Sequence, residues 1–380
     1  MKIRVLHCIS DSNIGGAGRL LLHLLRHFDK DVFDVRVVLP RDSALIPGIR
    51  DCGIPVIETE HGRDASHDRG GIGEFCRIFR REKPHIVHTH SSLDAKIAAW
   101  LCGVKCRIYT RHSVFDPPKK LTTFPGKQIA GAVNNTLATR IIAVAQAAAD
   151  ILTATGVRED KIHVILNGVE PLTPSTAGEC AALRRKLGFA ETDFVCGISA
   201  RMEPYKGHSY LVETAKAVCA VRPDAKFLVM GTGTTYEDTI RLAKEAGLSG
   251  NMVFTGFLSD VTPYYSIMNL SLNCSWGTEA TSLALIEAMS LGLPAVVTTF
   301  GGNPGVIEEG VNGLLVPEKD SQAMADAILR IMEDPVLYDT LSAGAKNRFG
   351  EKFTARAMTE QLESVYKEEC RRCGFMKVPI

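Results

Sequence analysis

The sequence has 380 residues, with 44 Lys and Arg against 43 Asp and Glu and a formal net charge of +1 at pH 7. This length predicts about two domains, each able to bury its own core. The absence of a long apolar run argues against a membrane-spanning protein. With no export signal after Met1, the eleven cysteines are expected to be mostly free thiols in a reducing, cytoplasmic compartment.

The charge is spread unevenly. Residues 1–170 hold 24 Lys and Arg against 18 Asp and Glu, a net charge of +6, so the remainder carries −5. A basic first half suits an anionic acceptor or peripheral contact with the inner face of an anionic membrane. Arg77, Arg80, Arg81 and Lys83 surround apolar residues on one predicted helix. They fit such contact, but an ordinary solvated helix face accounts for them at least as well.

Strands and helices alternate along the chain, which is the pattern of doubly wound parallel sheets. Predicted strands in the first half are residues 3–9, 34–40, 55–59, 85–90, 106–112, 140–145 and 163–168, with helices such as 18–28 and 94–103 between them. Residues 171–178 are rich in Pro, Thr, Ser and Gly and predict a linker. Further strands follow at residues 194–200, 226–231, 252–256, 270–275, 294–299 and 313–316. We therefore predict an α/β fold with two Rossmann-like domains facing each other across a cleft.

A glycine-rich segment, IGGAGR at residues 14–19, follows the first predicted strand. Gly15 and Gly16 would let the backbone approach a phosphate at a helix N-terminus. The spacing is not Gly-x-Gly-x-x-Gly, and the second strand ends in Leu39-Pro40-Arg41 without the carboxylate that a nicotinamide cofactor's ribose needs. A dehydrogenase is therefore disfavoured, and a merely tight strand-to-helix turn remains an alternative.

The most informative segment contains Glu279 and Glu287, which are separated by seven residues. Ser282 can cap a short helix between them. The backbone N–H groups of Thr281, Ser282 and Leu283 would then face a ligand, and a helix N-terminus suits a phosphate. Because each carboxylate can accept from a vicinal diol, the segment indicates a nucleotide-sugar site. Two solvated glutamates near a helix start are the alternative.

Arg201 and Lys206 lie five residues apart on the loop after another predicted strand. Two fixed cations can neutralise a leaving diphosphate without a metal, although two exposed surface cations are the alternative. The sequence shows no Asp-x-Asp motif of a metal-dependent transferase, and Cys370-x-x-Cys373 has no second pair to complete a zinc site. We expect no metal and no cofactor.

Histidines stand at the ends of two predicted strands, where crevice residues of parallel sheets lie. His112 follows one strand, and His88 and His90 end another. A strand-end histidine is more often structural than functional. His88 and His90 therefore fit either the lining of an acceptor site or a packed, capping role.

Together these motifs resemble those of the retaining glycosyltransferases of family 4, which have the GT-B architecture. The resemblance covers nearly the whole chain, in the family's order: IGGAGR, HTHS, YTRHS, ILNGV, GISARMEPYKGH, FTGFLSDVTPYYSIMNLSLNCS and SWGTEATSLALIEAMSLGLPAVVTTFGGNP, with its Glu-x7-Glu signature. It implies an acceptor-binding domain over residues 1–170 and a nucleotide-sugar-binding domain over residues 179–353. A C-terminal helix, about residues 354–380, would return to the first domain.

The resemblance also implies residue roles. Arg201 and Lys206 would hold the diphosphate, Glu279 the sugar hydroxyls, Glu287 the ribose, and His112 would orient the donor sugar. The remaining implied donor contacts are Gly15 and Gly16 near the diphosphate, Phe257 and Leu258 at the base, and the backbone of Ala280, Thr281, Ser282 and Leu283 at the sugar.

The implied reaction is retaining, metal-independent transfer from a UDP- or GDP-sugar to a hydroxyl of a saccharide or lipid-linked cell-envelope acceptor, with no nucleic-acid partner. The chain departs from the family pattern at Ala145, Glu170, Ala280 and Gly305, where Ser, Asp, Gly and Glu are common. The missing carboxylate at 305 can alter donor choice or remove a support for the loop. A GT-B-like nucleotide-sugar isomerase or phosphorylase, or a non-catalytic sugar-nucleotide-binding subunit, remains an alternative.

Overall fold

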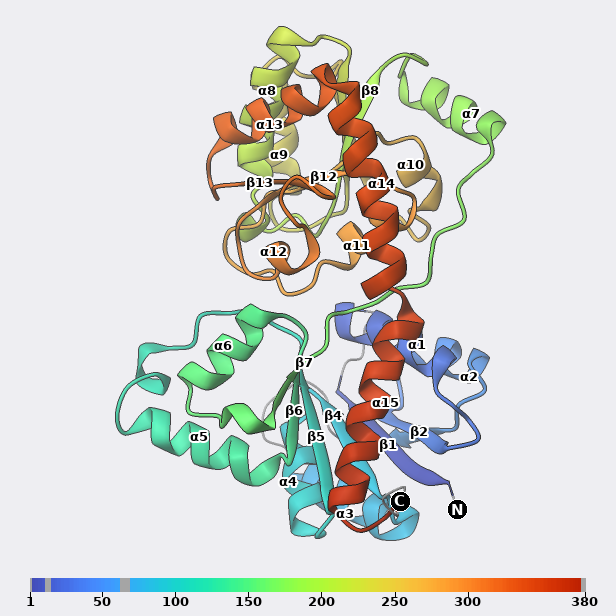
Figure 1. Ribbon diagram of the computed structural model, residues 1–380, viewed down its shortest axis with the longest axis vertical. Coiled ribbons are helices and arrows are strands. Elements are labelled where there is room, and N and C mark those ends of the chain that lie inside the picture. The colour runs from blue at the N-terminus through green and yellow to red at the C-terminus, as the bar shows by residue number, and fades with distance from the viewer. Residues whose placement is uncertain (1, 11–14, 62–68, 377–380) are drawn as a thin grey trace. The chain divides into compact units, whose positions relative to one another are not determined.

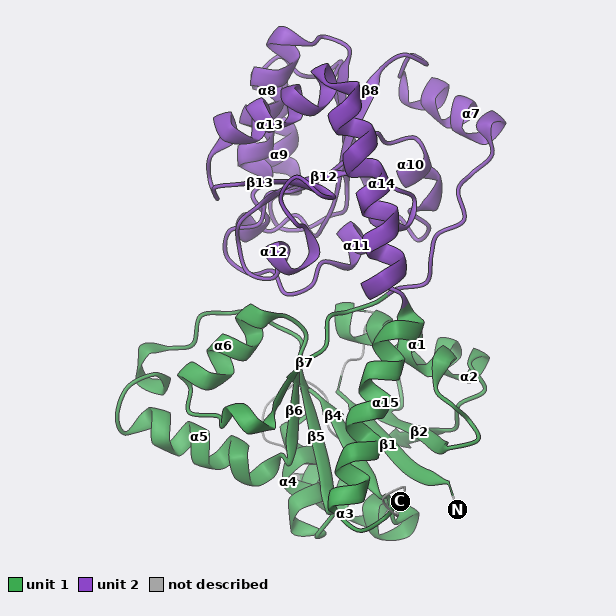
Figure 2. Cartoon of the chain, viewed as in Figure 1, with its two compact units in different colours: residues 1–168, 355–380 green, residues 169–354 purple. Residues whose placement is uncertain are grey.

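The computed structural model describes residues 2–10, 15–61 and 69–376. It contains two compact units (Figure 2): unit 1 comprises residues 1–168 and 355–380, and unit 2 comprises residues 169–354. Each unit is built on one parallel sheet flanked by helices (Figure 1). The predicted pair of doubly wound α/β domains is thus confirmed. Within the described ranges, no helix combines the length and apolarity needed to cross a membrane.

Unit 1 contains a seven-stranded sheet in the order β3-β2-β1-β4-β5-β6-β7. Its strands are β1 (Ile3–Ile9), β2 (Phe33–Pro40), β3 (Val56–Thr59), β4 (Ile86–His90), β5 (Cys106–Arg111), β6 (Arg140–Ala143) and β7 (Ile162–Val164). Its helices are α1 (Gly16–His27), α2 (Ile46–Asp51), α3 (Arg69–Glu82), α4 (Leu93–Leu101), α5 (Gly126–Leu137), α6 (Gln146–Ala154) and the C-terminal α15 (Ala355–Arg372). The order reverses between β1 and β4, which makes that junction the switch point of the sheet.

Helix α15 is distant in sequence from the rest of unit 1 but packs against α1. Its buried side chains include Met358, Leu362 and Tyr366. The Tyr366 ring stacks on Phe28, with ring centroids 6.0 Å apart, and meets Phe33 edge-on. Burial of these rings against the first strands stabilises the return of the C-terminal helix to this unit.

Unit 2 contains a six-stranded sheet in the order β10-β9-β8-β11-β12-β13. Its strands are β8 (Phe194–Ser199), β9 (Ala225–Met230), β10 (Met252–Gly256), β11 (Leu270–Asn273), β12 (Ala295–Thr298) and β13 (Gly313–Val316). Its helices are α7 (Ala177–Leu187), α8 (His208–Val221), α9 (Tyr236–Glu245), α10 (Thr262–Ser266), α11 (Leu283–Ser290), α12 (Asn303–Val306), α13 (Ser321–Glu333) and α14 (Pro335–Lys352). Here the order reverses between β8 and β11, so the same topology recurs with a second switch point.

Helix ends follow recognisable local signals. Thr176 and Glu179 form a reciprocal capping box at the start of α7, directly after the Pro-rich segment. Gly188 ends that helix in the left-handed conformation, at φ 75°. Asp320 and Asp334 cap α13 and α14 by accepting from backbone N–H groups of the first turn.

The basic helix α3 has a solvated polar face and a packed apolar face. Phe75, Ile78 and Phe79 are buried in the core of unit 1, whereas Arg77 and Arg80 are exposed. The apolar side of this helix is therefore already occupied by the protein. Contact of its basic side with an anionic membrane stays a prediction.

Candidate active site

The charged residues singled out in the sequence gather at the switch point of unit 2. Lys206 ends a short 3-10 helix, η3 (Pro204–Lys206), in the loop after β8, and Glu279 lies in the loop after β11. Strands β8 and β11 are neighbours in the sheet. Because both strands are parallel, their carboxyl ends lie at the same edge, where α/β proteins of this topology bind ligands.

The Glu279 carboxylate is buried, and one of its oxygens is held by three donors. Its Oε2 accepts from Lys206 Nζ at 2.8 Å, from Asn273 Nδ2 at 2.9 Å and from Ser275 Oγ at 2.9 Å. Lys206 Nζ also donates to the carbonyl of Thr278 at 3.3 Å. The other oxygen, Oε1, makes no hydrogen bond within the described parts of the chain, so the protein anchors only one of the two carboxylate oxygens.

Asn273 and Ser275 were not among the predicted site residues, and no pairing of Lys206 with Glu279 was predicted. The lysine was expected to be a phosphate ligand and the glutamate a sugar ligand. The structure joins them in a buried ion pair, with side chains 13% and 10% exposed. The signal that was available is the alternation of polar residues in the predicted strand over residues 270–275, since alternate residues of a strand share a face; in the structure Asn273 ends β11 and Ser275 follows two residues later.

Backbone contacts tie the loops of this site together. The Trp276 N–H donates to the Tyr205 carbonyl at 2.9 Å, and the indole Nε1–H donates to the Pro204 carbonyl at 3.0 Å. Gly207, at φ 74°, passes so close to the Cys274 carbonyl that a Cβ would lie 2.1 Å from its oxygen. The loop that carries Lys206 is thus locked against the loop that carries Glu279.

A third loop, after β12, supports the backbone of Glu279. The Gly302 N–H donates to the Glu279 carbonyl at 2.9 Å. Gly301 lies at φ 59°, and a Cβ on it would be 2.2 Å from that same carbonyl oxygen. Only glycine fits this close approach without displacement of the Glu279 loop.

The segment around Gly305, where a glutamate is common in the resembled family, has another support. The Arg348 guanidinium of α14 donates to the Gly305 carbonyl at 3.2 Å and to the Val306 carbonyl at 3.0 Å. It also pairs with Glu308. The loop is therefore anchored from α14 without a carboxylate at position 305.

Helix α11 begins beside Glu279 as the sequence predicts. Ser282 is its N-cap and accepts from the Leu285 N–H at 3.4 Å. Thr281 and Ser282 are buried, Ala280 and Leu283 are half-buried, and Glu287 is buried one turn into the helix. The N–H groups at this start provide partial positive charge close to the ion pair.

The other predicted residues of unit 2 are more accessible. Arg201 is exposed, and its guanidinium has no ion pair or hydrogen bond to any residue that the structure describes. Phe257, directly after β10, is 78% exposed, while Leu258 packs partly against the apolar core. Arg201 and Phe257 are thus available for a ligand, in contrast to the engaged Lys206.

The predicted residues of unit 1 lie near the carboxyl edge of its sheet. Gly15 is the N-cap of α1 and Gly16 its first residue, and both are exposed; Ile14 lies outside the described residues. His112 follows β5, is half-buried, and its Nε2 is 2.9 Å from His90 Nδ1. His88 and His90 are buried, so they have the packed role that the sequence left open.

Burial keeps these imidazoles neutral at neutral pH. It lowers the pKa of His112 to about 4 and that of His7, on β1, to about 3. The pKa values of His88 and His90 are likewise well below the usual range, because of burial first and neighbouring histidines second. The switch point of unit 1 therefore contains uncharged hydrogen-bond donors and acceptors, whereas that of unit 2 contains fixed charges.

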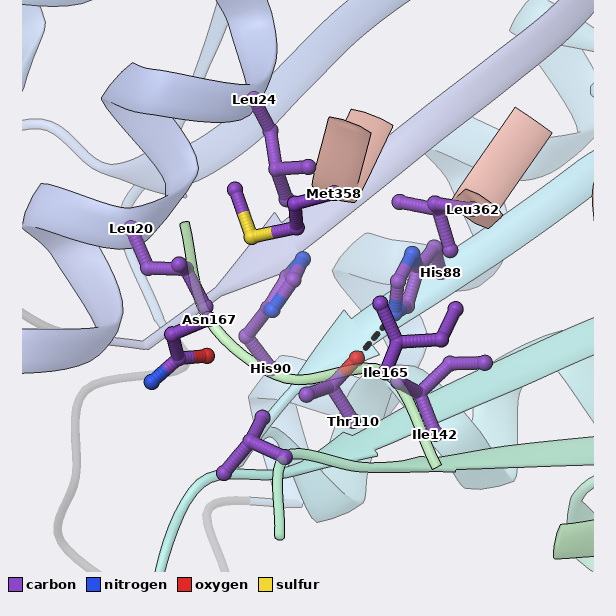
Figure 3. Close-up of a pocket in the computed structure, with 11 residues that line it drawn as sticks. Leu20, Leu24, His88, His90, Thr110, Ile142, Ile165, Asn167, Met358 and Leu362 are labelled. Atoms are coloured by element: carbon purple, nitrogen blue, oxygen red, sulfur yellow. Dashed lines mark hydrogen bonds between the residues drawn. The ribbon is translucent and has the colours of Figure 1, made fainter. Parts of the chain in front are cut away.

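A small cavity lies beside His88, His90 and Thr110 (Figure 3). Its volume is about 20 Å³, and the side chains of α1 and α15 that close it, including Leu24 and Met358, are apolar. This is about enough for one water molecule and far too small for a sugar or a nucleotide. The cavity is consequently a feature of the packed interior.

Comparison with known proteins assigns the family. Residues 14–171 match the family model described as Glycosyltransferase Family 4, and residues 181–348 match the one described as Glycosyl transferases group 1. The chain belongs to the family 4, group 1 glycosyltransferases. An Escherichia coli relative, named UDP-Gal:alpha-D-GlcNAc-diphosphoundecaprenol alpha-1,3-galactosyltransferase, is 25% identical over 96% of this chain and 97% of its own length.

Further matches agree with this family and with its architecture. N-acetyl-alpha-D-glucosaminyl L-malate synthase of Bacillus anthracis is 23% identical to this chain, and the match covers 80% of each of the two chains. The crystal structure of Anabaena HepE in complex with UDP has a TM-score of 0.83 at 22% identity, and the match covers 97% of this chain and 100% of that one. The fold is GT-B, and the expectation of a glycosyltransferase is confirmed.

Proposed function

We propose that this glycosyltransferase moves a sugar from a UDP- or GDP-sugar to a hydroxyl of a saccharide or lipid-linked cell-envelope acceptor, with retained anomeric configuration and without a metal. The observation that carries the proposal is the Lys206–Glu279 pair beside the start of α11 at the unit 2 switch point. The names of relatives support it: the E. coli protein is named for UDP-Gal and a diphosphoundecaprenol-linked sugar, and HepE has also been solved with UDP-glucose.

In this mechanism the leaving diphosphate is bound by cations and backbone N–H groups. Arg201 is exposed and lies five residues before Lys206 on the same loop, so the two side chains together offset the negative charge that develops on the leaving group. The N–H groups at the start of α11 add partial positive charge. This arrangement performs the electrostatic work that a divalent metal performs in other transferases.

Glu279 orients the sugar in this proposal. Three donors fix its Oε2, so the carboxylate has a defined rotamer and Oε1 can accept from a sugar hydroxyl. Glu287 would accept from the ribose, and Phe257 and Leu258 would contact the base. From unit 1, Gly15 and Gly16 would approach the diphosphate, and His112 would contact the donor sugar.

The bond between the anomeric carbon and the diphosphate oxygen breaks with oxocarbenium character. The acceptor hydroxyl attacks the anomeric carbon from the same face from which the leaving group departs. A phosphate oxygen of the leaving group takes the proton of the acceptor hydroxyl. The bond broken is the glycosyl phosphate bond, and the bond formed is the new glycosidic bond. Because the proposal includes no nucleophile on the opposite face, it does not use the double displacement of retaining hydrolases.

We further propose that the protein works in the cytoplasm, with unit 1 as the acceptor-binding part and with peripheral contact at the inner face of the membrane. The net charge of +6 over residues 1–170 supports attraction to anionic lipid. Co-sedimentation with phosphatidylglycerol vesicles, but not with neutral phosphatidylcholine vesicles, is the expected result. Equal or absent binding to both would contradict the membrane contact while leaving sugar transfer untouched.

A panel of UDP- and GDP-sugars with saccharide and lipid-linked acceptors tests the reaction. We expect one donor to be consumed in proportion to product, an unchanged rate in excess EDTA, and an α-configured product by NMR from an α-linked donor. Sugar epimerised without an acceptor would instead indicate an isomerase, and dependence on inorganic phosphate a phosphorylase. Donor binding without turnover across the panel would indicate a non-catalytic subunit.

A further inference from the structure

Unit 1 contains an unbroken series of hydrogen-bonded side chains, of which the proposed reaction uses only His112. It joins six groups, which we call the histidine chain, in the order His112, His90, His7, Tyr366, His88 and Thr110. His112 Nε2 lies 2.9 Å from His90 Nδ1, and His90 Nε2 lies 2.9 Å from His7 Nδ1. The Tyr366 hydroxyl then joins His7 Nε2, at 3.3 Å, to His88 Nδ1, at 2.5 Å. The last separation is 2.6 Å, from His88 Nε2 to Thr110 Oγ1. Figure 3 shows its last link, between His88 and Thr110.

The sheet register brings these side chains together. His7 of β1 is paired with His88 of β4. His88 and His90 are two residues apart on one strand and therefore point to the same face. Thr110 of β5 is the register partner of His90, and Tyr366 reaches this face from α15. The histidine chain thus crosses three strands at the unit 1 switch point and includes the C-terminal helix.

Water has little access to most of the histidine chain. His7, His88, His90 and Thr110 are at most 3% exposed, and Tyr366 is fully buried. Burial holds the pKa of each histidine below the usual range and raises the pKa of Tyr366. Each imidazole therefore has one N–H and one acceptor nitrogen, and the tyrosine has a single proton to donate.

A linear series of this kind has two consistent directions. In one, each histidine carries its proton on Nδ1 and the Thr110 hydroxyl donates to His88 Nε2. In the other, each histidine carries its proton on Nε2, and the Thr110 hydroxyl must find a different acceptor. A mixture either places two donors or two acceptors face to face at a link, or makes Tyr366 Oη accept from both His7 and His88 and leaves the buried Tyr366 proton without a histidine acceptor. Each of these arrangements costs the desolvation of a polar group that makes no hydrogen bond.

The Thr110 hydroxyl selects between the two directions. Its oxygen is buried, and His88 Nε2 is its single hydrogen-bond partner within the residues that the structure describes. In the first direction the Thr110 proton is used in that bond. In the second direction that proton has no acceptor among the described residues and can be satisfied only by a water molecule ordered in the adjacent cavity of about 20 Å³, which costs free energy. The geometry therefore favours protons on Nδ1 throughout.

We propose that the histidine chain fixes His112 as a neutral ring with its proton on Nδ1, so that this N–H is a preset hydrogen-bond donor to the donor sugar. His90, His7 and Tyr366 are positioning residues, because they act through His112. His112 Nδ1 has no partner among the described residues, so its N–H is available to a ligand. The part of the proposal that concerns the sugar rests on the proposed function; the protonation pattern does not.

A metal ion bound by His7, His88 and His90 is the competing account. One nitrogen of each ring lies within 4.8 Å of the others. Zinc ligands, however, converge on the ion at about 2.0–2.1 Å and so lie well over 3 Å from one another, whereas His7 Nδ1 and His90 Nε2 are 2.9 Å apart. The rings of His88 and His90 are stacked, with centroids 4.4 Å apart and planes at 27°. Stacked rings in direct hydrogen bonds fit a hydrogen-bonded series better than a metal centre.

Two-bond ¹H–¹⁵N correlation spectra of the ¹⁵N-histidine-labelled full chain at pH 7.5 test the protonation pattern directly. We expect His7, His88, His90 and His112 all to show a protonated Nδ1 and an unprotonated Nε2. His→Gln variants at each position assign the signals. Four Nε2–H rings, or a mixture of tautomers at His112, would overturn the proposal. Titration with Zn²⁺ alone should leave the four signals in place, and a stoichiometric shift would assign a metal site instead.

Thr110→Val and Thr110→Ser form a matched pair for the direction of the series. Valine keeps the shape but removes the hydroxyl donor to His88, so the spectra should show mixed tautomers as far as His112. Serine keeps the hydroxyl and should keep the wild-type pattern. Tyr366→Phe breaks the series in the middle and should release His7, His90 and His112 together. Circular dichroism and thermal unfolding verify that each variant remains folded.

Kinetics then connect the protonation pattern to sugar binding. If the competent tautomer falls to a minority, the apparent KM for the donor rises about 3- to 10-fold while kcat changes little. Thr110→Val and Tyr366→Phe should show this split, and Thr110→Ser should not. An altered tautomer with an unchanged KM would contradict the link to the sugar. Loss of turnover in His112→Ala, with unaltered tautomers in Tyr366→Phe, would support the proposed function but reject the histidine chain.

Discussion

The switch points of the two units share one topology but contain opposite chemistry. In unit 1 the order reverses between β1 and β4, and the junction holds three neutral histidines of these strands, to which His112 is hydrogen-bonded from the end of β5. In unit 2 it reverses between β8 and β11, and the junction holds a buried ion pair near an exposed arginine. The fold determines where a ligand can be bound, whereas the side chains determine whether that place offers fixed charge or uncharged hydrogen bonds.

In the proposed function, this difference suits the two kinds of group in a nucleotide-sugar donor, a charged diphosphate and an uncharged sugar. A diphosphate carries negative charge that grows as it leaves, so it needs cations that are already in place. A sugar is uncharged and is recognised by directional donors and acceptors. In the proposed function, unit 2 supplies the cations and unit 1 supplies an oriented imidazole. The two sites should therefore respond differently to mutation and to pH.

The largest effect is expected at Lys206, because its side chain has two roles. Lys206→Ala removes a proposed diphosphate ligand and leaves the buried Glu279 carboxylate with Asn273 and Ser275 as its remaining donors. Transfer should slow by about 10²- to 10³-fold, and unfolding should become easier by about 1–3 kcal/mol. Steady-state kinetics and chemical denaturation measure the two effects. Lys216→Ala, at an exposed lysine of α8, should change neither, and a transfer rate within a few-fold of wild type for Lys206→Ala would contradict the assignment.

The neutral switch point of unit 1 should make the protein sensitive to mild acid. The pKa of His7 falls from 6.5 to about 3 in the folded state, so between these values the unfolded chain binds a proton that the folded chain does not. Stability from this group is complete above pH 6.5 and decreases as the pH falls below it, with a slope of up to about 1.4 kcal/mol per pH unit per ring. His88, His90 and His112 have the same sign.

Urea denaturation between pH 5 and pH 7 measures that slope in a range where carboxylates change little. His7→Gln should unfold more easily at pH 7 and should show a shallower dependence on pH than the wild type. The exposed His61 provides the matched control, and His61→Gln should retain the full slope. Identical slopes for the wild type and His7→Gln would show that the buried ring does not titrate as described.

Alanine substitutions at Gly301 and Gly310 distinguish the cost of a steric clash from the cost of an unfavourable backbone conformation. Both have positive φ, at 59° and 72°, but a Cβ at Gly301 would lie 2.2 Å from the Glu279 carbonyl oxygen, whereas a Cβ at Gly310 would have no atom within 4 Å. Gly310→Ala should cost about 1 kcal/mol from backbone strain alone. Gly301→Ala should cost about 1–2 kcal/mol more and should weaken donor binding, because the Glu279 loop must move. Equal losses of stability, with unchanged donor binding, would remove the supporting role of Gly301.

The sequence predicted the sheets and the positions of the charged loops, because both depend on local signals. Apolar runs with alternating helices marked each strand, and the motifs with Lys206 and Glu279 followed two of them. To predict the ion pair between them, one must know that β8 and β11 are neighbours in the sheet, and no local sequence pattern shows this. The contact of Tyr366 with His7 joins residues 359 positions apart, so the role of the buried histidines stayed open until the fold was known.

Arg201 and Lys206 lie on one loop, but Arg201 is exposed whereas Lys206 is held in a buried ion pair. Substitution of Arg201 should therefore affect ligand binding without the loss of stability expected at Lys206. Because Arg201 is exposed and has no ion pair within the described residues, Arg201→Ala should leave the melting temperature within about 1–2 °C of wild type. It should still weaken donor binding about tenfold if it contacts the diphosphate. Isothermal titration with UDP alone measures the affinity. A large fall in melting temperature would show that Arg201 has a structural role, and unchanged UDP affinity would remove it from the site.

The smallest effect is expected at Phe257, where the proposed contact is with the base. A phenylalanine that is 78% exposed contributes little to the core, so its removal should not change stability beyond about 0.5 kcal/mol. If its ring covers one face of the base, Phe257→Ala should weaken UDP binding about 3- to 10-fold, the range of one partly exposed aromatic contact. Phe257→Tyr retains the ring and should retain the affinity. Because Lys206 and Arg201 bind the phosphates in this proposal, Phe257→Ala should leave affinity for inorganic pyrophosphate unchanged, and a parallel loss for pyrophosphate would place the ring away from the base.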